Sequence, residues 1–455
     1  MSAIKIKLAA MNFLEFAVWG AYLVSLGIYL AGVGLGDKIY WFYTVQGIVS
    51  IFMPAVIGII ADRWIQAQKM LSICHLIAGL FMGAAGAYCL FAGNNIEFAP
   101  LFTLYTISVA FYMPTIGLAN SVAYTALNKA GLDTVVHFPP IRVFGTIGFI
   151  ASMLLTNFLP INGISMQKTF FQLFSSGIIG LILAAYALTM PSCPVSKGGS
   201  TSISDALGLK AFALFKQRRM AIFFIFSMLL GVSLQITNSY GSTFINAFEQ
   251  VSRYADSWVA QNATALISLS QISETLCILL IPFCLKRFGI KGVMLIAMLG
   301  WVLRFGFFGL GNPEMPGVLL FVLSCVVYGV AFDFFNISGS LYVDQQTDKG
   351  IRSSAQGLFM LMTNGIGATI GTLAAGQIVN RYVYSRPVES QIEGWQTSWY
   401  IFAAYGLVVT ILFWLIFRDS SKPTVSDAKA ALIDGDSPEG FVTGDDPETP
   451  NAKER

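Results

Sequence analysis

Residues 317–336 read GVLLFVLSCVVYGVAFDFFN, a run in which Asp333 is the only charged residue. A transmembrane helix needs about 20 mostly apolar residues, so this stretch predicts a membrane crossing. The whole chain of 455 residues is 55% hydrophobic and only 11% charged, whereas soluble domains carry about 25% charged residues. Because apolar runs of this kind recur along the chain, the sequence predicts an all-α, multi-pass membrane protein.

The apolar runs predict twelve transmembrane helices. They lie near residues 8–32, 40–61, 70–92, 98–126, 140–159, 168–190, 220–247, 259–284, 291–311, 316–340, 353–379 and 395–417. If the N-terminus is cytoplasmic, most loop Lys and Arg residues fall on the cytoplasmic side, as the positive-inside rule requires. The sequence therefore predicts that both termini are cytoplasmic.

The longest internal loop, residues 191–219, divides these helices into two halves of six. The N-terminal half is expected to span residues 1–190 and the C-terminal half residues 220–418. Two related halves around a site at the membrane midplane are typical of secondary transporters. Residues 419–455 are rich in acidic residues and proline, which predicts a disordered cytoplasmic tail.

Composition argues against several other functions. The net charge of +3 combines basic cytoplasmic loops with an acidic tail, so no nucleic-acid partner is expected. The six cysteines form no CxxC motif and the two histidines lie far apart in sequence, so no metal or cofactor is predicted. We also find no GxGD or HExxH pattern that would indicate an intramembrane enzyme.

Three predicted helices of the C-terminal half each carry a pair of polar residues at a spacing of three, which places both on one helix face. The pairs are Gln235 with Asn238, Gln271 with Glu274, and Asp333 with Asn336. Amides and carboxylates suit a ligand with several hydroxyl groups, and Tyr328 and Phe332 could add an aromatic wall. The alternative is that these polar groups hydrogen-bond to one another as structural contacts between helices.

Charged residues inside membrane helices are costly and commonly functional. A buried carboxyl is a natural carrier of a transported proton, because burial favours its protonated form. Asp333 is the first choice for this role, with Glu274 as a second proton-coupling residue. For Glu15 a structural role ranks first, ahead of a second proton site. Arg304 is expected to pair with a carboxylate or to extend toward the membrane surface.

In the N-terminal half, Arg142, Thr146 and Phe149 recur at i, i+4 and i+7, which places them on one helix face. If their helix begins at Pro140, Arg142 lies near the cytoplasmic surface. If it begins nearer Asp133, Arg142 lies deep enough to reach a ligand.

Several strings carry a family resemblance. The loop Gly58-Ile59-Ile60-Ala61-Asp62-Arg63 and the six-plus-six plan resemble the major facilitator superfamily, although the usual following glycine and basic cluster are missing. Asp62 and Arg63 are expected to act as an inner gate. Longer strings resemble the bacterial nucleoside:proton symporter family, namely residues 138–149, 216–224, 234–238, 270–276 and 328–338.

The resemblance implies proton-coupled nucleoside uptake across the bacterial inner membrane by alternating access, with nucleosides, protons and the lipid bilayer as partners of a monomer. It implies substrate binding by Arg142, Thr146, Phe149, Gln235, Asn238, Gln271, Glu274, Tyr328 and Phe332. The alternative is a proton-coupled sugar transporter of the same fold, because ribose and hexoses need similar polar groups. A channel or a receptor would also use buried polar groups. A channel would not accumulate the ligand, and a receptor would bind the ligand without moving it across the membrane.

Overall fold

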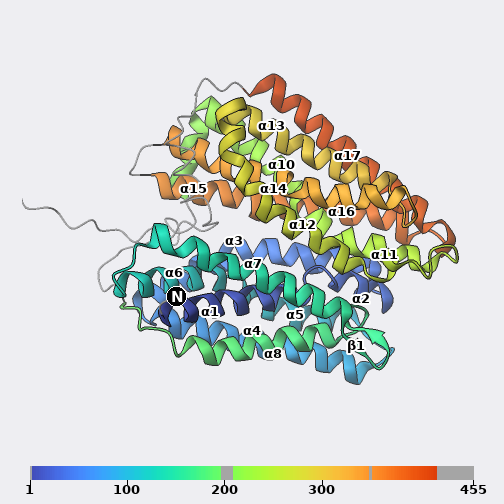
Figure 1. Ribbon diagram of the computed structural model, residues 1–455, viewed down its shortest axis with the longest axis horizontal. Coiled ribbons are helices and arrows are strands. Elements are labelled where there is room, and N and C mark those ends of the chain that lie inside the picture. The colour runs from blue at the N-terminus through green and yellow to red at the C-terminus, as the bar shows by residue number, and fades with distance from the viewer. Residues whose placement is uncertain (1–2, 196–208, 348–350, 418–455) are drawn as a thin grey trace, which may run out of the picture.

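The computed structural model describes residues 3–195, 209–347 and 351–417, and these are almost entirely helical. The helices run along the long axis of the molecule in two layers (Figure 1). One layer holds the helices of residues 3–187, drawn blue to green, and the other holds those of residues 209–416, drawn yellow-green to red. The predicted boundary between the halves, residues 191–219, lies partly outside the described residues and stays a prediction. The predicted tail, residues 419–455, lies outside the described residues.

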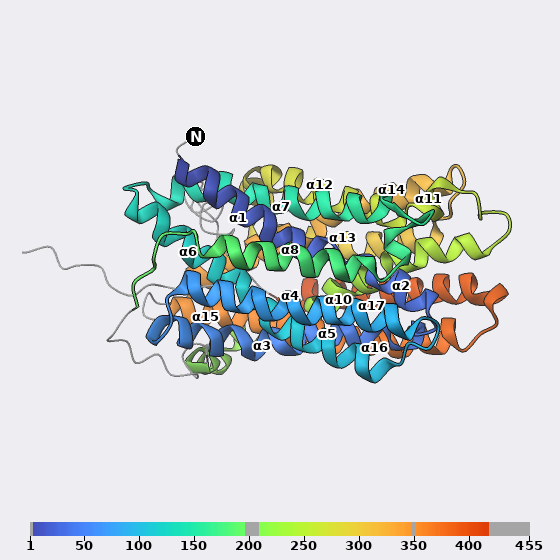
Figure 2. The same cartoon turned by 90° about the horizontal axis from the view of Figure 1, so that it is seen from below.

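The N-terminal half begins with a helix that packs against the last long helices of the same half (Figure 2). Its elements are α1 (Ala3–Gly20), α2 (Leu26–Gly32), η1 (Gly36–Lys38), α3 (Ile39–Arg63), α4 (Ala67–Ala92), α5 (Phe98–Tyr112), α6 (Thr115–Lys129), α7 (Thr134–Phe158), β1 (Pro160–Ile161), β2 (Ile164–Ser165), η2 (Met166–Lys168) and α8 (Phe171–Ala187). Strands β1 and β2 form a short antiparallel hairpin in which Pro160 faces Ser165. Its two turn residues, Asn162 and Gly163, have positive φ, as a tight hairpin turn requires.

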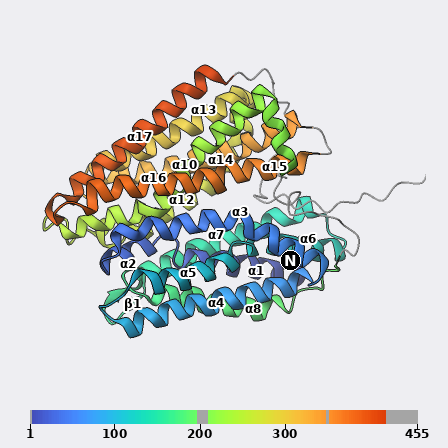
Figure 3. The same cartoon turned by 180° about the vertical axis from the view of Figure 1, so that it is seen from behind.

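The C-terminal half contains the longest helices of the described chain (Figure 3). Its elements are η3 (Leu209–Lys216), α10 (Arg218–Ala247), η4 (Phe248–Gln250), α11 (Trp258–Gln261), α12 (Ala263–Cys277), η5 (Ile278–Leu280), α13 (Ile281–Leu310), α14 (Gly317–Gln346), α15 (Arg352–Met360), η6 (Leu361–Gly367), α16 (Ala368–Val379), η7 (Asn380–Tyr384), η8 (Val388–Ser390) and α17 (Gln391–Ile416). Helix α13 bends at Gly289, whose φ is 69°. The bend lies between the predicted spans 259–284 and 291–311.

Long apolar helices confirm the multi-pass membrane architecture. Among the described residues, nine helical segments are long and apolar enough to cross a membrane. One of them, Ala263–Leu310, includes the bend at Gly289, and Phe171–Ala187 is a further, shorter apolar helix.

The first predicted span, residues 8–32, is interrupted rather than continuous. Helix α1 ends at Gly20 and α2 begins at Leu26, with turns between them. Hydroxyl groups of other helices satisfy carbonyl groups in this break, which an apolar environment requires. Thr156 donates to the Ala21 carbonyl at 3.0 Å, Tyr43 donates to the Leu23 carbonyl at 2.5 Å, and Ser242 donates to the Val24 carbonyl. The break therefore depends on residues distant in sequence.

Candidate functional site

The polar pair of α10 forms as its spacing predicts. The Asn238 side-chain amide donates a hydrogen bond to the Gln235 side-chain oxygen at 3.1 Å, and both residues are half-buried. This bond orients the two amides while leaving donors and acceptors of both side chains for other partners.

Tyr328 of α14 links the two other predicted polar positions. Gln271 of α12 lies near its hydroxyl, and Glu274 and Asp333 lie close enough to act on it electrostatically. The Tyr328 ring stacks on Phe332, with 5.6 Å between ring centroids and an interplanar angle of 12°. The structure therefore gathers Gln271, Glu274, Tyr328, Phe332 and Asp333 into one group, which we call the C-half cluster.

A glycine allows α12 and α14 to approach closely enough to form this cluster. A Cβ atom at Gly329 would lie 2.6 Å from the backbone carbonyl oxygen of Ser273 and 2.8 Å from the backbone nitrogen of Glu274. The Ser273 hydroxyl donates to the Val326 carbonyl across the same contact. Any larger side chain at residue 329 would separate Glu274 from Tyr328.

Arg304 of α13 packs against Tyr328 of the C-half cluster, a contact that the sequence did not predict. Its side chain is 1% exposed, and Nη1 donates to the Ser270 hydroxyl at 3.2 Å and to the Ser324 carbonyl at 2.8 Å. The guanidinium carbon lies 4.4 Å from the centroid of the Tyr328 ring. The expected carboxylate pairing is wrong for the described residues, because a carbonyl, a hydroxyl and aromatic rings surround this cation instead.

Helix α7 carries the three predicted residues of the N-terminal half. It begins at Thr134, so Arg142 lies about 12 Å along the helix at 1.5 Å per residue. This start agrees with the deeper of the two positions considered for Arg142. The Arg142 guanidinium carbon lies 3.9 Å from the centroid of the Phe16 ring, a cation–π contact. Phe149 is buried edge-on against Trp19, whereas Thr146 is half-buried.

The helices that carry the two sets of residues are neighbours. Helix α7 packs closely on α1, where a Cβ atom at Gly148 would lie 2.1 Å from the Phe13 carbonyl oxygen. Helix α7 also packs against α12 across the boundary between the halves, as the ribbon shows (Figure 1). Arg142 and the Gln271–Glu274 pair therefore belong to helices that meet at this boundary. For the predicted gate, the backbone of Asp62 and Arg63 ends α3, and their side chains lie outside the described residues.

Glu15 belongs to a separate buried group in the N-terminal half. Its carboxylate lies 2.7 Å from His75 Nε2 and accepts a hydrogen bond from the Thr115 hydroxyl at 2.6 Å. The Tyr112 hydroxyl donates to the Glu15 backbone carbonyl at 2.9 Å. Glu15 and His75 are fully buried, and together these contacts tie α1 to α4, α5 and α6. They support the structural role that ranked first in the sequence analysis.

Replacing Glu15 with Leu should lower the free energy of unfolding by about 3 kcal/mol, because His75 and Thr115 would lose a buried partner. Thermal unfolding of the detergent-solubilised protein measures this loss as a lower melting temperature. A matched control is Asp37→Asn, since the Asp37–Lys38 pair is exposed and should contribute less than about 1 kcal/mol. Equal melting temperatures for the two variants would contradict a structural role for Glu15.

Comparison with known proteins gives a consistent result across almost the whole chain. Residues 1–422 match the Nucleoside H+ symporter family. The chain is 44% identical to the xanthosine permease of Escherichia coli K12, covering 92% of this chain and 97% of the permease. It is also 44% identical to the E. coli nucleoside permease NupG, covering 91% of this chain and 96% of that protein.

Solved structures agree with the sequence relationship. A crystal structure of nucleoside transporter NupG superimposes with a TM-score of 0.82 at 42% identity, covering 92% of this chain and 100% of that chain. A crystal structure of a D-xylose–proton symporter gives a TM-score of 0.63 at 13% identity, covering 93% of this chain and 100% of that chain, which supports the transporter fold alone. The chain therefore belongs to the nucleoside H+ symporter family and is a membrane transporter rather than an enzyme.

Proposed function

We propose that this protein takes up nucleosides together with protons across the bacterial inner membrane, by alternating access of a site between its two halves. The match of residues 1–422 to the nucleoside H+ symporter family carries this conclusion. Proton-coupled nucleoside transport is the activity of that family, and the permeases that the chain resembles are nucleoside and xanthosine permeases.

The C-half cluster supplies the polar groups for the sugar of the substrate. A carboxylate accepts hydrogen bonds from two hydroxyls, so Glu274 is suited to the ribose, and Gln271 adds both a donor and an acceptor. Gln235 and Asn238 of α10 present the same amide chemistry from a third helix. Tyr328 and Phe332 provide a stacked aromatic surface on which an apolar face of the ligand packs.

The N-terminal half supplies the opposite wall. Arg142, Thr146 and Phe149 share one face of α7, and we assign them to the nucleobase, which offers hydrogen-bond acceptors to a guanidinium and a flat surface to a ring. The contact between α7 and α12 supports this placement, because the helix that carries these residues lies next to the helix that carries Glu274.

We assign the transported proton to Asp333. Its side chain is 6% exposed and it follows Phe332 directly in the C-half cluster. A proton on this carboxyl removes a buried negative charge next to the ligand. Coupling requires that the proton stabilise one conformation more than the other, and a buried charge that is present only in the deprotonated state provides that difference. Glu274 is the second candidate for this role.

The proposed topology has twelve crossings with both termini cytoplasmic. The count follows if Ala263–Leu310 makes two crossings around Gly289, if Phe171–Ala187 makes one, and if α1 and α2 together make another. The cytoplasmic end is then the one that carries the N-terminus, where Asp62 and Arg63 end α3 and would act as the inner gate. We propose that the protein transports its substrate as a monomer.

Competition for uptake separates the proposed substrate from a sugar. In cells that express this chain, unlabelled uridine and adenosine should abolish uptake of labelled uridine, whereas a hundredfold excess of glucose or xylose should leave it unchanged. Competition by the hexose or pentose alone would favour the sugar transporter instead.

A further inference from the structure

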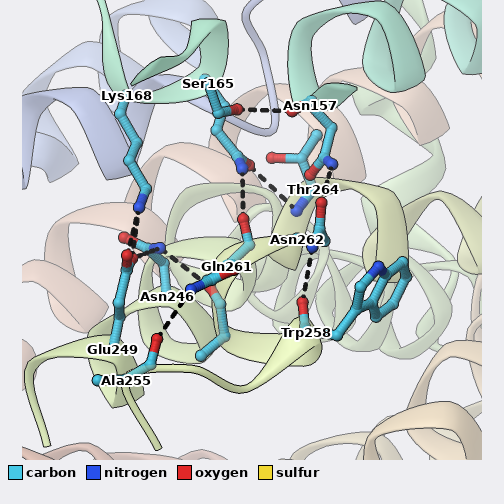
Figure 4. A network of polar contacts seen from close by, with 12 residues as sticks. Asn157, Ser165, Lys168, Asn246, Glu249, Ala255, Trp258, Gln261, Asn262 and Thr264 are labelled. Carbon is cyan, nitrogen blue, oxygen red and sulfur yellow. Dashed lines mark hydrogen bonds and ion pairs between the residues drawn. The ribbon is translucent and has the colours of Figure 1, made fainter. Parts of the chain in front are cut away.

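A polar network joins the two halves (Figure 4). It lies near β1 and α11, at the end of the molecule opposite the N-terminus (Figure 1). Its N-half members are Asn157, Gln167 and Lys168, and its C-half members are Glu249, Gln261, Asn262, Thr264 and Ala265. We call this set the inter-half network. None of these residues belongs to the substrate or proton assignments made above.

Two buried amides from the N-terminal half complete the first turn of a helix in the C-terminal half. The Asn157 side-chain oxygen accepts a hydrogen bond from the Ala265 backbone N–H at 3.1 Å, and its amide donates to the Asn262 side-chain oxygen at 2.7 Å. The Gln167 side-chain oxygen accepts from the Thr264 backbone N–H at 3.4 Å, and its amide donates to the Gln261 carbonyl at 2.8 Å.

These contacts have a specific physical role. The first N–H groups of an α-helix lack partners within the helix and need a capping group. The residue that precedes α12, Asn262, forms no side-chain cap of its own. Asn157 and Gln167 therefore cap α12 from the other half, and they are only 2% and 0% exposed. Separating the halves at this end leaves the first turn of α12 without these partners.

An ion pair completes the network at its edge. Lys168 Nζ lies 2.7 Å from Glu249 Oε1, and both side chains are about 30% exposed. The Asn246 amide donates to the same carboxylate at 3.0 Å and to the Ala260 carbonyl at 3.0 Å, which holds Glu249 in place. Lys168 follows Gln167 directly in η2, so the ion pair and the buried cap act on the same short segment.

We propose that the inter-half network is the latch that closes this end of the transporter, and that it must come apart each time the site between the halves opens on this side. The inference rests on the proposed alternating-access function. It assigns to Asn157, Gln167, Lys168 and Glu249 control over the balance between the closed arrangement seen here and an arrangement open at this end.

Chemical labelling of a buried position tests this balance without relying on transport. Thr264 is fully buried in the network, and it contributes its backbone N–H rather than its side chain, so Thr264→Cys keeps the contact. In detergent, a water-soluble maleimide should label this cysteine slowly while the network is closed. The same chain with Thr264 intact measures the background from the six native cysteines.

Charge substitutions should then shift the balance from the closed arrangement toward the open one. Lys168→Glu places two carboxylates face to face, and Glu249→Lys places two ammonium groups face to face, so each should raise the labelling rate at least tenfold. The double substitution, Lys168→Glu with Glu249→Lys, restores opposite charges and should return the rate to that of the parent. Asn157→Leu, which leaves the ion pair intact, should also raise labelling, because α12 loses one of its two capping groups.

A second ion pair in the same region is a matched control. Arg253 and Glu314 pair through Nε at 2.7 Å, but both belong to the C-terminal half. Arg253→Glu should therefore leave the labelling rate unchanged. The proposal is overturned if Lys168→Glu and Glu249→Lys label at the parental rate, if the double substitution does not restore that rate, or if Arg253→Glu raises labelling as much. Labelling reports opening whatever the substrate is, so this result stands apart from the test of nucleoside uptake.

Discussion

Asp333→Asn should abolish proton-driven accumulation of nucleoside while retaining exchange of nucleoside across the membrane. Asparagine resembles the protonated carboxyl in shape and carries no charge, so the halves can still close around the ligand. It cannot release a proton, so the gradient no longer drives the cycle. A proton that crosses 100 mV releases about 2.3 kcal/mol, which corresponds to roughly fiftyfold accumulation for one-to-one coupling. This is the loss we expect.

Proteoliposomes measure the two activities of the Asp333→Asn variant separately. Accumulation is followed under an imposed inward proton gradient, and exchange is followed with labelled nucleoside outside and unlabelled nucleoside inside at equal pH. Asp256→Asn is a suitable control, because Asp256 is exposed in the segment before α11. Gradient-driven uptake at the parental level in Asp333→Asn would show that Asp333 does not carry the proton.

Glu274→Gln should weaken nucleoside binding about tenfold, because a hydrogen bond to a charged acceptor contributes about 1.5 kcal/mol or more. Glutamine keeps the length of the side chain and one acceptor oxygen, so the packing of α12 on α14 should remain. The substitution would remove the negative charge that Glu274 places near the Tyr328 hydroxyl.

Calorimetric titration of uridine into the purified protein measures the change caused by Glu274→Gln. The exposed Glu389 provides a control, since Glu389→Gln changes the same chemistry far from the C-half cluster. Equal affinity in Glu274→Gln and the parent would remove Glu274 from the ribose site. A loss of affinity together with an altered pH dependence of binding would support the additional proton-coupling role.

Much of the C-terminal half could be predicted because its polar residues follow local helical spacing. Gln235 and Asn238 are three residues apart, and they hydrogen-bond to each other. Tyr328 and Phe332 are four residues apart, and their rings stack. Such contacts depend on helix geometry alone, so the sequence was sufficient to predict them.

The remaining features depend on partners distant in sequence. Hydropathy placed the start of α7 at Pro140, but the helix begins at Thr134, so the depth of Arg142 stayed open until the structure was known. Arg304 was expected to pair with a carboxylate or to extend toward the membrane surface, whereas it is buried and its partners are a hydroxyl, a carbonyl and an aromatic ring on other helices. The break after Gly20 needs hydroxyl groups from α3, α7 and α10.

The inter-half network is the clearest example of contacts that the sequence alone does not predict. Asn157 and Gln167 are about 100 residues from the helix that they cap, and a polar residue at the end of a predicted span usually indicates only a membrane surface. Family membership would direct attention to the substrate site rather than to these residues. The hydrogen bonds to α12 are therefore evident only from the folded arrangement of the two halves.

Uptake of labelled uridine into proteoliposomes with an inward proton gradient, with and without a protonophore, tests the central claim most directly. We predict uridine accumulation well above the external concentration, and a fall to the external concentration when the protonophore is added. Uridine that only equilibrates under the gradient, or that accumulates equally with the protonophore present, would contradict proton-coupled nucleoside transport by this protein.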